Sequence, residues 1–224
     1  MIEQLAIFDL DHTLLGRDSD VLWCEFLMQR GVLDRDHFEP LNREMERAYQ
    51  ASTVSAADYC AFYIGTLSGR TRAQWRVLRG DYLASVIAPR IPATAQALVR
   101  QHAQQGHTLV LSTATNRFLS ELTAGYLGIN ELIATECELD MQGRFTGRAS
   151  GVLNMREGKV ARLHAWLAAR GLQAGQWAAT AYSDSINDLP LLQAATQAVC
   201  VNPDARLAAH TPTHGWPTVM LHRG

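Results

Sequence analysis

Short apolar runs alternate with segments of helical periodicity along most of this 224-residue chain. The apolar runs predict strands at residues 5–8, 107–112, 132–137, 177–183 and 197–201. Apolar side chains at helical spacing predict helices between several of these strands, at residues 94–105, 117–127 and 158–170. Because crossover helices cover a parallel sheet on both faces, we expect an α/β fold with a Rossmann-like, doubly wound parallel sheet.

A helical stretch interrupts this alternation directly after the first strand. Helical spacing recurs in it at residues 21–28, 38–49, 56–66 and 75–87, and the pattern indicates no strand among them. Pro89 and Pro92 end the stretch, since two prolines so close together favour a boundary. We therefore expect an α/β core made of residues 1–14 and 91–224, with a helical unit, residues 15–90, inserted after the first strand.

Composition narrows the class of protein. Hydrophobic residues make up 47% of the chain and charged residues 19%, which is typical of a folded globular protein. The net charge of −2 gives no basic field, so we expect no nucleic-acid partner. No apolar run is long enough to cross a bilayer, and residues 1–10 lack the features of a signal peptide. We expect a cytoplasmic protein with reduced thiols at its four widely spaced cysteines, Cys24, Cys60, Cys137 and Cys200.

The most informative motif follows the first predicted strand, where residues 9–14 read DLDHTL. Where a strand curls into a loop, the side chains of Asp9 and Asp11 can converge on one pocket. One carboxylate could then attack a phosphorus or carbon centre while the other moves a proton. Asp and Thr are also common in turns and at helix N-caps, so the motif alone leaves a catalytic site and a plain turn equally open.

Polar residues also follow the second predicted strand and begin a later helix. Ser112 and Thr113 could hold an anionic oxygen through a hydroxyl and free backbone N–H groups, or they could only cap a helix. Lys159 lies in the first turn of a predicted helix, where a cation opposes the helix dipole. That position indicates a further duty for Lys159, and an ordinary solvated lysine is the alternative.

A third cluster follows the fourth predicted strand, where residues 183–188 read SDSIND. Asp184, Asn187 and Asp188 supply two carboxylates and an amide within five residues. Such an oxygen-rich environment suits Mg²⁺. Since the carboxyl ends of parallel strands share one edge of a sheet, we expect Asp9, Ser112 and Asp184 to lie together.

The order of these motifs resembles that of the haloacid dehalogenase superfamily. An Asp-x-Asp-x-Thr motif, a Ser at a strand end, a Lys and an Asp-rich cluster occur in the family's order across nearly the whole chain. The helical insertion resembles the C1 cap of the phosphoserine phosphatase-like branch, and a predicted hairpin at residues 138–147 resembles the flap of that branch. The chain is identified on these motifs as a member of the superfamily.

This resemblance implies a role for each motif residue. Asp9 would be the nucleophile that forms an aspartyl-phosphate, and Asp11 the general acid and base. Mg²⁺ would be held by Asp9, the backbone carbonyl of Asp11 and Asp184, with Asp188 as a ligand through water or as a support. The substrate phosphate would be bound by the remaining motif residues, Ser112, Thr113, Lys159 and Asn187.

Asp11 also indicates the kind of reaction. A halide leaves without a proton, whereas the alkoxide of a phosphate ester needs one, so Asp11 favours phosphate esters over haloacids. We expect a Mg²⁺-dependent hydrolase of a small phosphorylated metabolite. A phosphotransferase or phosphomutase of the same superfamily, and a noncatalytic protein that binds phosphate or a metabolite on this fold, are the alternatives. A phosphoryl-accepting receiver domain is disfavoured because its smaller fold has no cap.

The substrate's alcohol is indicated only by residues of the cap. Asp18 occupies the place where phosphoserine phosphatase-like enzymes carry an acid that contacts the substrate amine, which suggests phosphoserine or histidinol phosphate. The equally weighted alternative is that Asp18 only caps the next helix. Phosphoserine would also need an arginine for its carboxylate, and no motif aligns the candidates, Arg70, Arg72, Arg76 and Arg79. The sequence gives no indication of an oligomeric state.

Overall fold

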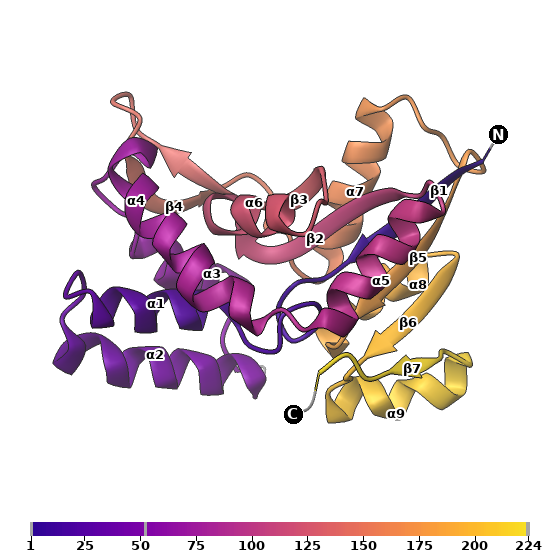
Figure 1. Cartoon of the computed structure of the whole chain (residues 1–224), viewed down its shortest axis with the longest axis horizontal. Coiled ribbons are helices and arrows are strands. Elements are labelled where there is room, and N and C mark those ends of the chain that lie inside the picture. Colours follow the sequence, from indigo (N-terminus) through magenta and orange to yellow (C-terminus); the bar gives the residue numbers. More distant parts are fainter. Residues whose placement is uncertain (1, 52, 223–224) are drawn as a thin grey trace.

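The computed structural model describes residues 2–51 and 53–222, so residues 1, 52, 223 and 224 of the expected units lie outside the described residues. It contains a seven-stranded sheet of order β4-β3-β2-β1-β5-β6-β7 (Figure 1). The strands are β1 Glu3–Phe8, β2 Thr108–Asn116, β3 Glu131–Leu139, β4 Phe145–Ser150, β5 Trp177–Ser183, β6 Gln197–Val201 and β7 Thr218–Val219. Neighbouring strands are parallel except for β4, which runs antiparallel to β3. The expected doubly wound α/β fold is confirmed.

Helices cover both faces of the sheet because the central strands alternate between two apolar cores. Leu5 and Ile7 of β1 are buried in the cluster that also contains side chains of three helices, α7 Glu157–Ala169, α8 Leu189–Ala194 and α9 Ala205–His214. Ala6 and Phe8 are buried on the opposite face, in the cluster that includes α5 Ala93–Gln104 and α6 Arg117–Tyr126. This burial on both sides explains why β1 is a continuous apolar run.

The helical stretch after β1 forms a separate group of helices at one side of the sheet (Figure 1). Its helices are α1 Ser19–Gln29, α2 Arg35–Gln50, α3 Ala56–Gly65 and α4 Arg72–Tyr82, followed by a π-helical turn Leu83–Ile87 and a 3₁₀ turn Ala88–Arg90. Trp23 and Trp75 belong to the same buried cluster as Phe8 and Leu10, so this group packs directly on the core. The arrangement supports our proposal that residues 15–90 are a cap.

Two expectations about local structure differ from the outcome. The expected end of the second strand at Ser112 is wrong, because β2 continues to Asn116 and pairs with β3 beyond Ser112. Residues 112–116 read STATN, and a stretch this polar does not indicate a strand. Pairing with β3 keeps it extended. The sequence pattern also failed to indicate β7 and α9, which follow β6.

The hairpin expected at residues 138–147 is confirmed. The hairpin between β3 and β4 turns at Gly143, which has a φ of 73° that favours glycine. All four cysteines are free thiols. Within the described part of the chain, no helix has the length and apolar character needed to cross a membrane.

Candidate active site

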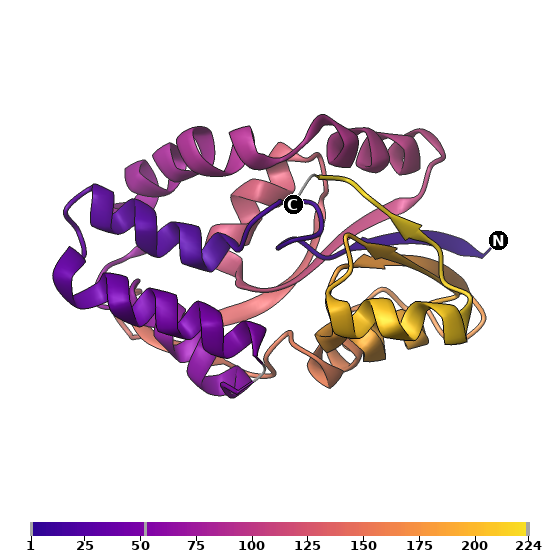
Figure 2. The same cartoon turned by 90° about the horizontal axis from the view of Figure 1, so that it is seen from below.

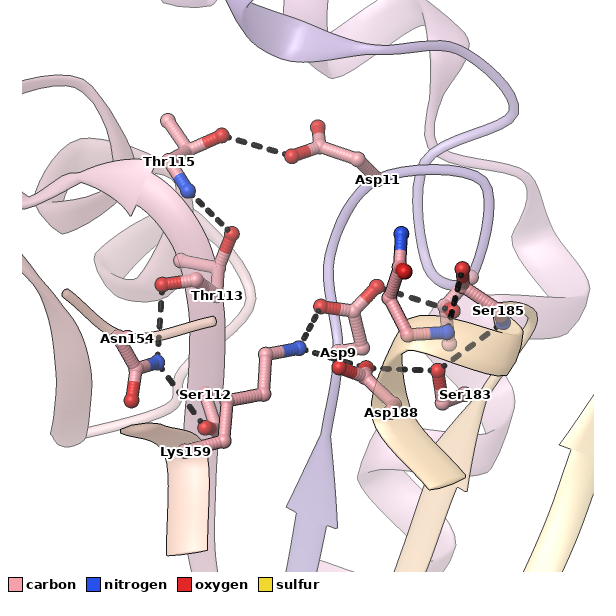
Figure 3. A network of polar contacts seen from close by, with 12 residues as sticks. Asp9, Asp11, Ser112, Thr113, Thr115, Asn154, Lys159, Ser183, Ser185 and Asp188 are labelled. Atoms are coloured by element: carbon pink, nitrogen blue, oxygen red, sulfur yellow. Dashed lines mark hydrogen bonds and ion pairs between the residues drawn. The ribbon is translucent and has the colours of Figure 1, made fainter. Parts of the chain in front are cut away.

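The loop that follows β1 turns sharply and sends its two carboxylates in different directions. Thr13 N–H and Leu15 N–H both donate to the carbonyl of Leu10, at 3.2 Å and 2.9 Å, and His12 takes a φ of 58°. Figure 3 shows the result: the carboxylate of Asp9 points towards Lys159, whereas that of Asp11 points towards Thr115. One turn thus separates the two carboxylates into different environments.

Asp9 lies in a buried ion-pair network with Lys159 and Asp188. Lys159 Nζ donates to Asp9 Oδ1 at 2.7 Å and to Asp188 Oδ2 at 2.6 Å. Burial alone would lower the pKa of Lys159, but the charges of Asp188 and Asp9 outweigh burial and raise it. Lys159, the only lysine in the sequence, is therefore a cation at the side of Asp9. A cation there offsets the repulsion between Asp9 and an incoming phosphate.

Thr13 connects Asp9 to Asp184. The Thr13 hydroxyl donates towards Asp184 Oδ1 at 2.8 Å and Asp9 Oδ2 at 3.2 Å, and it accepts from the backbone N–H of Asp184 at 3.0 Å. One hydroxyl proton thus serves two buried carboxylates. Burial and the charge of Asp9 raise the pKa of Asp184 well above its usual range.

This donor set fits a magnesium ion. Asp9 and Asp184 present hard carboxylate oxygens close together, which Mg²⁺ prefers. Asp188 is bound instead to Lys159 and to the hydroxyl of Ser183, at 2.6 Å and 2.7 Å, so it supports the site. Across residues 2–51 and 53–222, no three acidic, histidine or cysteine side chains converge as a ligand cluster. Mg²⁺ here would therefore need oxygens from water, backbone or phosphate as well, which is how it is usually bound.

Asp11 has its own hydrogen bonds. Its Oδ1 accepts from the backbone N–H of Ser19 at 2.7 Å, and its Oδ2 accepts from the Thr115 hydroxyl at 2.7 Å. Burial and the nearby charge of Asp18 raise the pKa of Asp11 to about 6 despite these bonds. A carboxyl group with a pKa near neutrality can both donate and accept a proton at working pH.

The residues expected to bind phosphate lie in different surroundings. Thr113 is fully buried and its hydroxyl accepts from the backbone N–H of Thr115 at 3.1 Å, beside Asp11. Ser112 is not brought to the pocket: its hydroxyl accepts from Asn154 Nδ2 at 3.2 Å (Figure 3). Asn187 lines a larger cavity next to the small pocket that is lined by Asp9, Asp11 and Lys159, which we call the acidic pocket. We infer that residues 113–115 of β2, of which Ala114 and Thr115 line this pocket, are the better candidate for binding phosphate oxygens.

Asp18 caps α1, as one of the two interpretations of its position expects, and its contact with a substrate amine stays a prediction. Its Oδ1 accepts from Val21 N–H at 2.9 Å and so caps α1, while its Oδ2 accepts from the Tyr59 hydroxyl at 2.7 Å. The same side chain lines the acidic pocket. Asp18 is therefore a buried carboxylate that lines this pocket together with Asp9 and Asp11.

Two cavities meet at these residues. The acidic pocket is the smaller, of about 50 Å³. It is lined by Asp9, Asp11 and Lys159, and by Tyr49 and Tyr59 of α2 and α3. A larger one of about 670 Å³ adjoins it and shares four of its lining residues, His12, Tyr49, Asp184 and Ser185. The larger volume is typical of a pocket for a small molecule. A phosphate beside Asp9 would thus have room for its alcohol in the larger cavity.

Several residues with evident parts in this network were missed by sequence reasoning. They are Thr13, Thr115, Asn154 and Ser183. Thr13 belongs to the DLDHTL motif, so its position was visible although its bridging contact was not. Asn154 donates to the carbonyls of Thr113 and Ile133, both at 2.9 Å, and no pattern around it indicates this contact.

The raised pKa values predict how the stability of the metal-free protein depends on pH. Burial raises the pKa of Asp9 to about 7 against the lowering effect of Lys159, so folding favours the protonated carboxyl. Its stabilising contribution is present at low pH and is lost as pH rises through about 7. Since Mg²⁺ binds the carboxylate and competes with the proton, we expect Mg²⁺ to raise Tm more at pH 8 than at pH 5.

Differential scanning fluorimetry with and without Mg²⁺ at the two pH values measures this. Asp184→Asn is the matched control, because it removes one proposed ligand and should abolish most of the Mg²⁺-induced rise. An equal rise at both pH values would contradict the expectation.

The chain is similar in sequence to a known family and to named proteins. A sequence model of the haloacid dehalogenase-like hydrolase family matches residues 6–193. A protein of Neisseria meningitidis serogroup C named histidinol-phosphatase is 34% identical over 219 residues, which are 97% of this chain and 99% of that protein. A protein of Mycobacterium tuberculosis named phosphoserine phosphatase is 30% identical over 221 residues, 94% of this chain and 68% of that protein.

The fold agrees with a solved structure along its whole length. The crystal structure of a protein of unknown function from Bordetella pertussis Tohama I has a TM-score of 0.93 and 36% sequence identity, and the match covers 99% of this chain and 100% of that chain. The resemblance to the phosphoserine phosphatase-like branch is confirmed by the sequence matches. The chain is an enzyme that belongs to the haloacid dehalogenase-like hydrolase family.

Proposed function

We propose that this protein is a Mg²⁺-dependent phosphomonoesterase that works through an aspartyl-phosphate. The observation that carries the proposal is the separation of the two carboxylates of the DLDHTL motif. Asp9 faces the buried cation Lys159, whereas Asp11 is held apart by Ser19 N–H and Thr115. A nucleophile beside a cation and an acid with a pKa of about 6 are the two groups that phosphoester cleavage requires.

The steps follow from these positions. A carboxylate oxygen of Asp9 attacks phosphorus, and the bond from phosphorus to the ester oxygen breaks. Asp11 gives its proton to the departing alkoxide and then takes a proton from the water that hydrolyses the aspartyl-phosphate. Lys159 stabilises the charge that gathers on the phosphoryl oxygens.

Mg²⁺, held by Asp9 and Asp184 with further oxygens, would supply charge neutralisation for the phosphate.

For the substrate we propose an amino-alcohol phosphate without a carboxylate, of which histidinol phosphate is an example. Asp18 offers a buried negative charge for the amine. The described residues that line the acidic pocket include no arginine to match the carboxylate of phosphoserine, and the arginine that lines the larger cavity, Arg206, lies on α9 outside the cap. The candidate arginines of the cap lie elsewhere: Arg70 covers the Trp75 ring, Arg72 and Arg79 pair with Glu121, and Arg76 is exposed. The name of the Neisseria relative supports the same substrate.

Phosphate release from a substrate panel tests the proposal. We expect the purified protein with Mg²⁺ to hydrolyse histidinol phosphate with a higher kcat/KM than phosphoserine or sugar phosphates. Asp18→Asn should raise KM for substrates with an amine, because it keeps a side-chain oxygen that can cap α1 but removes the charge. KM for phenyl phosphate, which lacks an amine, should stay the same in this variant.

Other outcomes would favour the alternatives. Release that requires an added acceptor alcohol indicates a phosphotransferase. Stabilisation by a phosphorylated ligand without any turnover indicates a noncatalytic binding protein and contradicts the proposal. Preference for phosphoserine would overturn the assignment of the substrate and leave the phosphatase activity standing.

A further inference from the structure

A short segment after α9 lies against the loop that carries Asp9. We call residues 217–222 the strap; it contains β7 and then runs up to the loop that follows β1 (Figure 2). Asn202 fixes it with three hydrogen bonds: its Oδ1 accepts from the N–H groups of Leu221 and His222, and its Nδ2 donates to the carbonyl of His222 at 2.7 Å. Thr94 adds a hydrogen bond from its hydroxyl to the carbonyl of Leu221.

This anchoring places the His222 ring against the loop between β1 and α1, residues 9–18, which we call the catalytic loop. His222 Nε2 donates to the backbone carbonyl of His12 at 2.7 Å, because a carbonyl oxygen can only accept. The ring also lies against Gly16, at the other end of the same loop, where an added Cβ would stand 3.6 Å from it. The strap therefore contacts the loop at two points that enclose residues 13–15.

The contact at His12 is connected to the reacting carboxylates. His12 has a left-handed backbone, which a residue with a side chain rarely adopts without support from its surroundings. The peptide between His12 and Thr13 is held on one side by Thr13 N–H bound to Leu10 and on the other by His222. The Thr13 hydroxyl next to this peptide contacts both Asp9 and Asp184.

We propose that His222 is a positioning residue for the nucleophile, acting from the strap through the His12–Thr13 peptide. Its hydrogen bond holds the left-handed turn and so sets the Thr13 hydroxyl between Asp9 and Asp184. The proposal rests on the proposed phosphatase function for its kinetic effect. Its effect on the carboxylate pair can be measured without turnover.

The test compares two replacements of His222. His222→Phe keeps a ring against Gly16 but cannot donate, whereas His222→Gln restores a donor that can reach the His12 carbonyl. We expect His222→Phe to lower kcat by about 10-fold to 100-fold, the scale of a catalytic group misplaced by up to about 1 Å, with KM changed less than about twofold. His222→Gln should recover most of kcat. His164→Ala, an exposed histidine of α7, is the matched control and should keep the activity of the wild type.

Two further measurements separate positioning from folding and from the proposed function. Calorimetric titration with Mg²⁺ alone should show several-fold weaker binding in His222→Phe, because the Asp9–Asp184 pair loses its fixed arrangement. Asn202→Gly, which tolerates the φ of 42° at that position but removes the anchor, should reproduce both effects. Wild-type kcat and Mg²⁺ affinity in His222→Phe would overturn the proposal, as would failure of His222→Gln to restore them. An absence of turnover in the wild type with a weakened Mg²⁺ affinity in His222→Phe would reject the phosphatase function and support the positioning role.

Discussion

Asp9→Asn should lower kcat at least about 10³-fold without unfolding the protein, because the amide cannot form the acyl-phosphate bond. The replacement is nearly isosteric, and burial already raises the pKa of Asp9 to about 7, so the folded state gives up little when the charge is removed. Tm in the absence of metal is therefore expected to stay equal or to rise. Steady-state phosphate release and a thermal melt, run on the same preparation, measure both effects.

The control for Asp9→Asn is Asp36→Asn, which makes the same chemical change at an exposed position of α2. It should leave kcat within about twofold, as is usual for a surface substitution. Residual activity of Asp9→Asn above about a tenth of the wild type would show that another group attacks phosphorus, and the assignment of the nucleophile would then be wrong.

Lys159→Met is expected to give the largest loss of stability. The ammonium group is bonded to Asp9 and Asp188 and only 2% of the residue is exposed, so its removal leaves two buried carboxylates without a cation. Breaking a buried ion pair in this way typically costs about 3–5 kcal/mol. The loss in the metal-free protein should be smaller at pH 5 than at pH 8, since burial raises the pKa of Asp9 to about 7 and its protonation removes uncompensated charge.

Urea denaturation of the metal-free protein at the two pH values measures the free energy of unfolding. The double variant Lys159→Met/Asp188→Asn has one buried charge fewer and should be more stable than Lys159→Met alone. An additive result, in which Asp188→Asn has the same effect with and without Lys159, would show that the pair at 2.6 Å does not couple. Loss of phosphatase activity is expected in both variants that lack Lys159.

The sequence predicted the parts of the site that lie on strand ends marked by apolar runs. The run before Asp9 and the run before Asp184 each correspond to a central parallel strand, β1 and β5, that pair with each other. The edge where these strands end could therefore be inferred from topology alone. Lys159 was singled out because a cation in the first turn of a helix contradicts the preference of the helix dipole, and its expected role came from the family resemblance.

The second strand shows where prediction from the local pattern of apolar and polar residues fails. Its sequence turns polar at Ser112, yet the chain stays extended to Asn116 because pairing with β3 overrides the local pattern. That pairing buries Ser112 against Asn154 and leaves Thr113 and Thr115 nearer to Asp11. The partner that decides which hydroxyl faces the pocket lies 42 residues away in the sequence.

Contacts between distant segments account for the remaining differences. The strap reaches the catalytic loop across 210 residues, and nothing near His222 or His12 in the sequence links them. Asp18 and Tyr59 join two cap helices across 41 residues. Side-chain contacts of this range depend on packing of the whole fold, which periodicity and spacing do not describe.

The single lysine of the chain makes the site directly observable by spectroscopy. The sequence carries 20 basic residues of the Lys and Arg types, and Lys159 is the one lysine among them. Selective ¹⁵N-lysine labelling would thus place one side-chain label in the entire molecule, between Asp9 and Asp188. Its ammonium resonance, shielded from solvent exchange by burial, would report each change of charge or occupancy beside Asp9 without an engineered probe.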